Sequence, residues 1–195
     1  MPEMLIRAAT QRDATDLVAL IDMAGEGLPT YFWTRAAEAG QGPFEIGRTR
    51  IMAEDGPFSY HNAHIAELDG AVAGATICRR LDDPPDLQGI DEVHEIVQPL
   101  VRLEARAPGA WYVNVLAVYP EHRGKGIGTR LLAHADGLGR AAAARGMAII
   151  VASENVDARA LYERVGYCER AKLPLVGYPG YKRGGDWILL TKPHS

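Results

Sequence analysis

The chain has 195 residues, of which 47% are hydrophobic and 24% charged, and its formal net charge at pH 7 is −4. This length predicts a single domain over residues 1–195 with a substantial core, and the composition is typical of a soluble globular protein. No run reaches the roughly 18 apolar residues of a membrane span, and the first residues lack the pattern of a secretory signal, so we expect a cytoplasmic protein with no membrane partner. The acidic balance argues weakly against nucleic acid as the main ligand.

The N-terminal part of the chain predicts a strand, a helix and a hairpin. Residues 5–9 read as the first strand, and Thr10 with Asp13 forms a variant of the helix-capping box. The next helix is expected to end near Gly25 or Gly27 and to bury a face made of Leu17, Leu20, Ile21 and Ala24. Residues 31–39 are interpreted as a second helix. Residues 63–78 alternate around Asp69 and Gly70, the strongest short hairpin signal, and so predict strands two and three.

Residues 80–110 predict a turn followed by a helix. The apolar residues follow a helical period over residues 90–100, at Ile90, Val93, Ile96, Val97 and Leu100. Pro99 interrupts this helix or starts a new turn. Two interpretations of the acidic side, which carries Asp91, Glu92 and Glu95, stay open. It is either a solvated surface or a substrate-facing lid whose carboxylates attract an amine.

Residues 113–132 predict a strand, a glycine-rich loop and an amphipathic helix. β-Branched residues favour a strand up to Val118, and the helix is expected to start at about Thr129. Between them, Gly124, Gly126 and Gly128 leave the backbone open to the close approach of a ligand. The unpaired N–H groups and the positive dipole end of the helix point back at this loop, so a diphosphate is its natural guest.

The C-terminal part predicts a strand over residues 147–153, a helix, and two closing strands over residues 169–176 and 186–192. Asn155 is a good N-cap for the helix, and Gly166 fits the left-handed residue that ends it. One helical face is expected to carry Ala158, Leu161, Tyr162 and Val165. The connector over residues 177–185 could contact a substrate through Tyr178 or Tyr181, although a loop without chemistry is the simpler interpretation.

Cysteine and histidine give no metal pattern. Cys78 and Cys168 fall in predicted strands and are expected to be reduced core thiols. His61 and His64 stand three apart near a strand, which would place them on opposite faces. We therefore expect no metal.

Two segments carry a family resemblance. The loop has Arg123, then Gly126 and Gly128 at the spacing of motif A of the GCN5-related N-acetyltransferase (GNAT) superfamily, and it resembles that motif over about residues 111–146. Residues 147–167 resemble motif B, which has Asn155, then Leu161 with Tyr162, then Gly166 with Tyr167. The resemblance implies an α/β three-layer fold with a mixed, mostly antiparallel sheet of about seven strands flanked by helices, and it makes residues 80–110 a variable insertion.

The same resemblance implies roles for site residues. The loop would hold the pyrophosphate of acetyl-coenzyme A, the expected co-substrate, through Arg123, Gly124, Lys125, Gly126, Ile127, Gly128 and Thr129. A bulge would splay the fourth strand from the fifth and expose backbone groups around Leu116, Ala117 and Val118. The Leu116 N–H would bind the acetyl carbonyl, and the N–H groups of Leu116 and Val118 the pantetheine arm. Asn155 would contact the cofactor, and Tyr162 would protonate the departing thiolate.

The implied function is N-acetyltransfer from acetyl-coenzyme A to a primary amine of a small molecule or peptide, by direct attack in a ternary complex. The general base is unassigned: Tyr112 and Asn114 on the fourth strand are unconvincing, and Glu67, Glu92 or Glu95 could act through water. A homodimer is an open option. The alternatives are a non-catalytic acyl-coenzyme A binding module and a dinucleotide-binding domain. A Walker A loop is excluded because Thr129 and Arg130 follow Gly128.

Overall fold

A computed structural model describes residues 3–181 and 184–194. Its seven strands form one mixed sheet in the order β1-β2-β3-β4-β5-β7-β6. The bounds are β1 (Met4–Ala8), β2 (Ala63–Leu68), β3 (Ala71–Arg80), β4 (Trp111–Val118), β5 (Met147–Ala152), β6 (Cys168–Pro174) and β7 (Asp186–Lys192). The parallel pairing of β4 with β5 runs from Trp111 to Val113, whereas β1–β2, β2–β3, β5–β7 and β6–β7 are antiparallel. The mixed, mostly antiparallel sheet of seven strands is confirmed.

Six α-helices lie within the described residues. They are α1 (Ala14–Ala24), α2 (Leu28–Ala36), α3 (Pro43–Met52), α4 (Gln98–Glu104), α5 (Ile127–Ala141) and α6 (Val156–Arg164). Short 3-10 turns precede α1 (η1, Gln11–Asp13) and β2 (η2, Tyr60–Asn62), and two more lie at η3 (Ile90–Glu92) and η4 (Pro120–His122).

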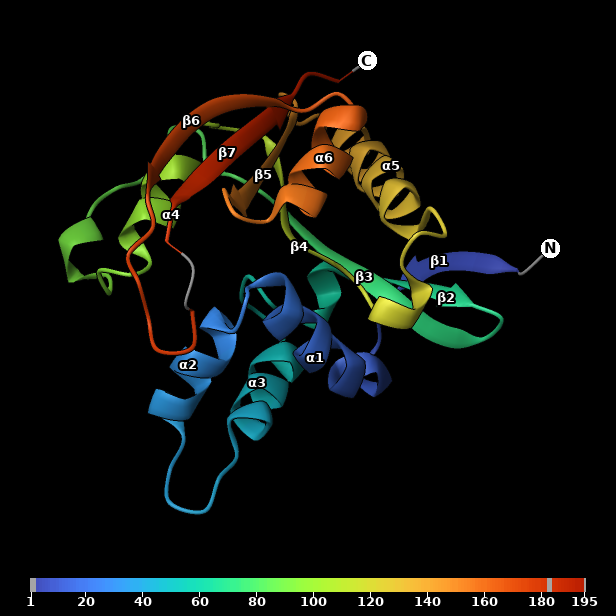
Figure 1. The fold of residues 1–195 in the computed structure, drawn as a ribbon, viewed down its shortest axis with the longest axis horizontal. Helices are drawn as coiled ribbons and strands as arrows, with labels where there is room; N and C mark the ends of the chain where they lie inside the picture. Colours follow the sequence, from blue (N-terminus) through green and yellow to red (C-terminus); the bar gives the residue numbers. More distant parts are fainter. Residues whose placement is uncertain (1–2, 182–183, 195) are drawn as a thin grey trace. The chain divides into compact units, whose positions relative to one another are not determined.

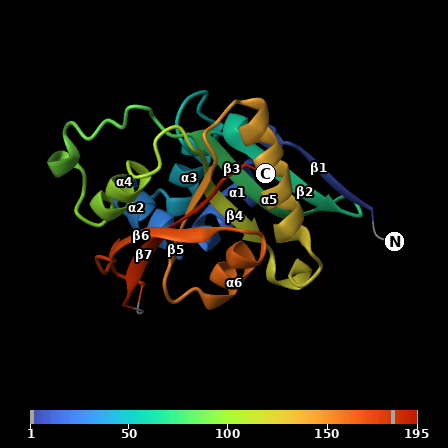
Figure 2. The same ribbon diagram turned by 90° about the horizontal axis from the view of Figure 1, so that it is seen from above.

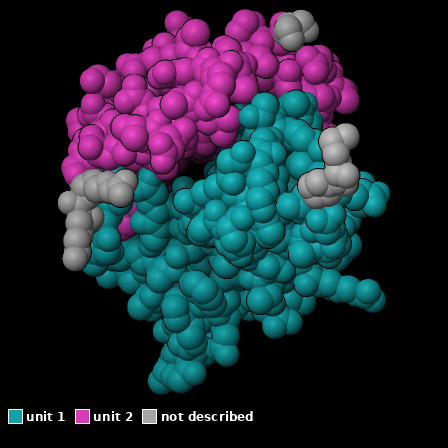
Figure 3. All heavy atoms as spheres, turned by 45° about the vertical axis from the view of Figure 1, so that its right-hand side comes forward, with its two compact units in different colours: residues 1–78, 114–134, 179–181 teal, residues 79–113, 135–178, 182–195 magenta. Residues whose placement is uncertain are grey.

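The chain packs into two compact units, which Figure 3 shows in different colours. Unit 1 comprises Met1–Cys78, Asn114–His134 and Pro179–Tyr181, and unit 2 comprises Arg79–Val113, Ala135–Tyr178 and Lys182–Ser195. The division therefore falls within β3, β4 and α5. The single domain over residues 1–195 stays a prediction.

The core of unit 1 lies between its strands and three helices. The predicted face of α1 is confirmed, since Leu17, Leu20 and Ile21 are buried against strand residues such as Ile65 and Ile77. α1, α2 and α3 pack together in this unit (Figure 1). The hairpin is also confirmed: Asp69 and Gly70 connect β2 to β3 with φ of +52° and +82°. Both residues thus have the positive φ that a two-residue type I′ turn requires.

The core of unit 2 lies beneath α4. Figure 2 shows α4 beside β6 and β7, and the buried cluster there includes Leu103, Tyr112, Ala148, Trp187 and Leu189. In this unit β6 pairs with β7 alone and so lies at an edge. Its exposed side chains are mostly charged: Glu169, Arg170 and Lys172, followed by Pro174. Lys172 also lies 3.2 Å from the Asp186 carboxylate.

Several element predictions are wrong in detail. The second helix is α2, which begins at Leu28 and ends at Ala36, and α3 was not predicted. The helix over residues 90–100 is absent: η3 and an irregular segment occupy that range, and α4 begins only at Gln98, with Pro99 in its first turn. Pro99 therefore lies in the first turn of α4, in agreement with the interpretation that it starts a new turn. α5 begins at Ile127, two residues before the expected Thr129.

Two side-chain predictions are also corrected. Cys78 is buried as expected, but Cys168 is exposed, so it is not a core thiol. His61 lies in η2 and not in a strand, so the opposite-face argument for His61 and His64 does not hold. Of the connector, Lys182 and Arg183 lie outside the described residues, and Tyr178 is buried.

Candidate functional site

In unit 1, the backbone groups of β4 from Val115 onward alternate between the side that faces β3 and the opposite side. The Thr76 hydroxyl donates to the carbonyl oxygen of Val115 at 3.0 Å, and the Tyr119 N–H donates to a β3 carbonyl oxygen at 2.9 Å. Residues 115, 117 and 119 therefore direct their backbone groups toward β3. Because backbone groups alternate along a strand, the N–H groups of Leu116 and Val118 face away from β3. This orientation suits the two donors that the sequence singled out.

The loop after β4 is open on the side where a ligand would approach. Gly124 and Gly126 have φ of +74° and +78°, values that favour glycine. No heavy atom outside the chain neighbours lies within 4 Å of the position that a Cβ would occupy at either glycine. The loop therefore has both the conformation and the free space of a phosphate cradle.

The start of α5 brings the N–H groups of a helix N-terminus next to this loop. The first helix-type bond runs from the Arg130 N–H to the Gly126 carbonyl oxygen at 3.1 Å. The N–H groups of Ile127, Gly128 and Thr129 precede that bond and belong to the orphan donors of a helix N-terminus. Ile127 is buried against Leu116 and Val118, which fixes this end of the helix. These residues fit a diphosphate, which needs N–H donors and positive potential.

The basic side chains of the loop differ in what they do. The Arg123 Nε donates to the Val118 carbonyl oxygen at 3.1 Å, and its Nη2 lies 3.3 Å from the Met23 sulfur. Arg123 therefore ties the loop to the ends of β4 and α1, which sequence reasoning missed. Lys125 is exposed and lies between the two left-handed glycines. That Arg123 and Lys125 bind the cofactor stays a prediction.

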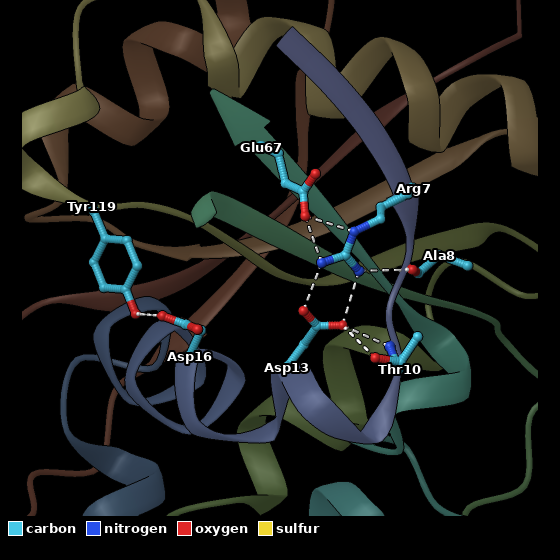
Figure 4. A network of polar contacts seen from close by, with 7 residues as sticks. All are labelled: Arg7, Ala8, Thr10, Asp13, Asp16, Glu67 and Tyr119. Carbon is cyan, nitrogen blue, oxygen red and sulfur yellow. Dashed lines mark hydrogen bonds and ion pairs between the residues drawn. The ribbon is translucent and has the colours of Figure 1, made fainter. Parts of the chain in front are cut away.

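Two polar contacts hold α1 in this unit (Figure 4). Arg7 of β1 forms an ion pair with Asp13, at 2.7 Å between Nη2 and Oδ1, and it also contacts Glu67 of β2 at 2.7 Å. The Arg7 guanidinium lowers the pKa of the Asp13 carboxyl to about 2. Separately, the Tyr119 hydroxyl donates to Asp16 at 2.8 Å, which pins the end of β4 to α1. Glu67 is thus engaged by Arg7, which weakens its case as a base.

In unit 2, α6 and its N-cap supply Tyr162 and Asn155, the two motif B residues to which the resemblance assigns a role. The Asn155 Oδ1 accepts the Ala158 N–H at 3.2 Å, so the predicted N-cap is confirmed. The Tyr162 side chain is buried, and its ring centroid lies 6.1 Å from that of Tyr167. Burial raises the pKa of Tyr162 above its ordinary value of 10, so its phenol is protonated at neutral pH. This state is the one that an acid needs.

A second polar cluster in unit 2 was missed by sequence reasoning. Arg79 of β3 forms an ion pair with Glu104 of α4, and its guanidinium lies 5.5 Å from the ring centroid of Tyr112 on β4. Tyr112 also acts on the Glu104 carboxyl, and its hydroxyl favours the ionised form and so opposes a rise in the Glu104 pKa. Burial raises the pKa of Glu104 above its ordinary value of 4.5, against the opposing effect of Arg79. No local pattern marks this cluster, because its members come from three separate elements.

Other candidate sites have little support in the structure. Glu92 and Glu95 are exposed, as is Asp91, which pairs with Arg102 at 3.3 Å.

Within residues 3–181 and 184–194, no group of three or more His, Cys, Asp and Glu side chains could hold a metal ion. Over the same residues, no helix has both the length and the apolar character needed to cross a bilayer.

Comparison with known proteins identifies the family. The model of the acetyltransferase (GNAT) family matches residues 29–167. N-alpha-acetyltransferase 40 of Saccharomyces cerevisiae is 32% identical over 137 residues, which cover 65% of this chain and 45% of that protein. The chain thus spans less than half the length of this curated relative.

Two solved structures illustrate the shared fold. An acetyltransferase of Salmonella typhimurium, solved with acetyl-coenzyme A, has a TM-score of 0.64 at 19% identity, covering 98% of this chain and 94% of that one. An agmatine N-acetyltransferase has a TM-score of 0.68 at 14% identity, with 97% and 99% covered. At these identities the likeness concerns the fold alone. Because the family model matches most of the chain, over residues 29–167, the chain belongs to the acetyltransferase (GNAT) family.

Proposed function

We propose that this protein transfers an acetyl group from acetyl-coenzyme A to a primary amine, by direct attack of the amine within a ternary complex. The observation that carries this proposal is the loop before α5. Its left-handed Gly124 and Gly126 leave open space, and the N–H groups of Ile127, Gly128 and Thr129 precede the first helix-type hydrogen bond of α5. A diphosphate group matches this arrangement in charge and in hydrogen-bonding capacity.

The backbone N–H groups of β4 that face away from β3 would hold the rest of the co-substrate. The N–H groups of Leu116 and Val118 face away from β3, so they are available as donors along one line. The Leu116 N–H binds the acetyl carbonyl oxygen, and as negative charge develops on that oxygen the same hydrogen bond strengthens. The Val118 N–H, near Ala117, binds the pantetheine arm. Asn155 contributes to cofactor binding from the start of α6.

Tyr162 acts as the acid that completes the transfer. Its phenol is buried and stays protonated at neutral pH, so it can donate a proton to the departing thiolate. The attacking amine must first lose its own proton, and no side chain is assigned to that step.

For the acceptor, we propose the α-amino group of a polypeptide. The yeast protein, whose name denotes an N-alpha-acetyltransferase, is 32% identical to this chain, whereas the solved structures described above are all below 20%. Small amines such as agmatine are the alternative acceptors, and a screen has to compare them with peptides.

The binding half of the proposal is tested by calorimetric titration with acetyl-coenzyme A, with coenzyme A and NAD as parallel ligands. Gly126→Val should abolish binding, because a branched residue is strained at a φ of +78° and its side chain would enter the open space of the loop. Gly137→Ala is the matched control, since its Cβ meets no neighbour within 4 Å and it lies inside α5, the helix that Gly126 precedes. Binding of NAD in place of acetyl-coenzyme A would refute the proposal.

The catalytic half is tested by coenzyme A release with short peptides that have a free N-terminus. The same peptides with a blocked N-terminus and an internal lysine, and agmatine, serve as competing acceptors. Tyr162→Phe should lower kcat by at least about 100-fold with little change in acetyl-coenzyme A affinity. Tight binding of acetyl-coenzyme A without transfer to any acceptor would indicate a non-catalytic binding module instead.

A further inference from the structure

Thr76 is a fully buried polar side chain on β3 that bonds to the backbone of β4. We propose that Thr76 is a positioning residue for acetyl transfer, because it orients and polarises the peptide group whose N–H binds the acetyl carbonyl oxygen. This inference rests on the role given to the Leu116 N–H in the proposed function. Thr76 acts through that peptide group and not by contact with the acetyl group.

The contact joins Thr76 to the peptide group between Val115 and Leu116. The Thr76 hydroxyl donates to the Val115 carbonyl oxygen at 3.0 Å. That carbonyl and the Leu116 N–H belong to one planar trans peptide, so they point in opposite directions. The carbonyl is held on the side of β3, and the N–H is therefore directed away from β3. One hydrogen bond thus fixes the plane in which the Leu116 N–H lies.

A hydrogen bond to a peptide carbonyl also makes the N–H of the same peptide a stronger donor. Bonds in a chain polarise one another, by about 10–30% per bond. The chain here extends to Cys78, whose sulfur lies 3.4 Å from the Thr76 oxygen. Because the single hydroxyl proton goes to Val115, the Cys78 thiol is the donor in that contact. The last member of this chain is the N–H that meets the developing oxyanion.

Packing alone does not account for a hydroxyl at this position. Valine has nearly the same shape as threonine and a comparable preference for strands, and it has no polar group to bury. A buried hydroxyl costs free energy unless it is hydrogen-bonded, so this site has to supply a partner. The partner that it supplies is the carbonyl of the peptide group that carries the proposed acetyl donor.

The second proposed donor of β4 has a different environment. The Val118 N–H belongs to the peptide group that begins with the Ala117 carbonyl. That carbonyl oxygen lies so close to Gly74 of β3 that a Cβ there would come within 2.5 Å of it. The pantetheine donor is therefore backed by bare backbone, whereas the acetyl donor is backed by a hydroxyl. This difference assigns Thr76 to the step in which charge develops on the acetyl oxygen.

Two pairs of proteins isolate the contribution of the hydroxyl. Wild type and Thr76→Val differ by a hydroxyl against a methyl, and Thr76→Ser and Thr76→Ala differ by the hydroxyl alone. The second pair keeps the comparison available if Thr76→Val does not fold. Single turnovers are measured at saturating acetyl-coenzyme A with the peptide acceptor that has the highest kcat/KM in the screen.

In each pair, loss of the hydroxyl should slow acetyl transfer about three- to tenfold, a part of the roughly 100- to 1000-fold effect of losing a whole oxyanion donor. The Kd for acetyl-coenzyme A should change less than about twofold, because the stronger donor acts mainly on the transition state. Ser59→Ala is the matched control. Ser59 is also buried in unit 1, and its hydroxyl donates to the Ala53 carbonyl oxygen at 2.7 Å. This variant loses a comparable bond that does not involve β4, so its transfer rate should stay that of wild type.

Infrared difference spectra report the acetyl hydrogen bond directly. Acetyl-coenzyme A labelled with ¹³C at the acetyl carbonyl should absorb at a lower frequency when bound to wild type than when free, because a donor polarises the carbonyl. The frequency should move back toward the free value in Thr76→Val and Thr76→Ala, and it should stay at the wild-type value in Thr76→Ser and Ser59→Ala. This readout needs no acceptor and does not respond to a general loss of stability.

The outcomes separate this inference from the proposed function. A wild-type frequency in both hydroxyl-free variants would overturn the role of Thr76. Equal losses in Thr76→Ser and Thr76→Ala would do the same, since they would show that the methyl group matters and the hydroxyl does not. A wild-type complex whose acetyl carbonyl absorbs at the free value would instead refute the acetyl-binding role of the Leu116 N–H. A wild-type protein that binds no acetyl-coenzyme A refutes the proposed function itself.

Discussion

Asp13→Asn should lower the free energy of unfolding at pH 7 by about 2.5 kcal/mol. Asp13 is nearly buried, with a side-chain exposure of 7%, and both of its oxygens accept from Arg7, at 2.7 and 2.9 Å. Its pKa is lowered from 3.8 to about 2, with the Arg7 hydrogen bond as the largest cause. At 1.36 kcal/mol per pKa unit, this shift gives about 2.5 kcal/mol in favour of the ionised form.

The sign of the pH dependence follows from that shift. Because the carboxyl has a lower pKa when folded, its contribution is fully present above pH 3.8 and is lost as the pH falls through about 2. The gap between wild type and Asp13→Asn should therefore be constant from pH 7 to 5. It should shrink to roughly half near pH 3, where the carboxyl is protonated in most unfolded molecules.

Urea unfolding at pH 7, 5 and 3 measures this gap. In a chain of 195 residues, the loss at pH 7 corresponds to a fall in Tm of about 5–10 °C. Asp16→Asn is the matched control one turn further along. The amide keeps an acceptor for the Tyr119 hydroxyl, so we expect a loss below about 1 kcal/mol. A gap at pH 7 below about 0.5 kcal/mol, or one that grows toward pH 3, would show that the Arg7 pair is too well solvated to matter.

Three further effects are expected. The rings of His64 and His134 have centroids 4.6 Å apart, and burial lowers the pKa of both side chains. The free energy of unfolding should therefore fall as the pH drops below 6.5. Urea midpoints measured from pH 8 to 5 should lose this pH dependence when both residues are replaced by Gln. Gly74→Ala would place a Cβ 2.5 Å from the Ala117 carbonyl oxygen, so unfolding measurements should show a loss of about 2 kcal/mol or more. Asn155→Ala removes the cap of α6 and should cost about 1 kcal/mol in the same assay, and no loss would exclude the cap as a stabilising contact.

The parts of the fold that sequence predicted well are those with local causes. The hairpin follows from Asp69 and Gly70, whose positive φ suits only a few residue types. The α6 cap follows from the side chain of Asn155. The strand, loop and helix order around Gly126 was equally readable, because turn glycines and β-branched residues act over a few positions.

The misses have non-local causes. α3 contains Gly47, a poor helix former, which is tolerated because the Trp33 ring covers it and leaves no room for a larger residue. The apolar period over residues 90–100 predicted a helix, yet Ile96 reaches the core from an irregular segment. Packing there overrides propensity. Likewise, Glu104 meets Arg79 and Tyr112 only through the register of strands far apart in sequence.

The exposed edge at β6 bears on how this protein behaves at high concentration. An edge strand offers unpaired N–H and C=O groups to any other chain, and pairing there is a common first step toward aggregation. The exposed Glu169, Arg170 and Lys172 would each have to be desolvated or paired by an incoming strand, and Pro174 lacks the N–H needed to extend the ladder. Intermolecular strand addition at this edge is therefore disfavoured. Replacing these charges with β-branched apolar residues would create an aggregation-prone edge without altering the core.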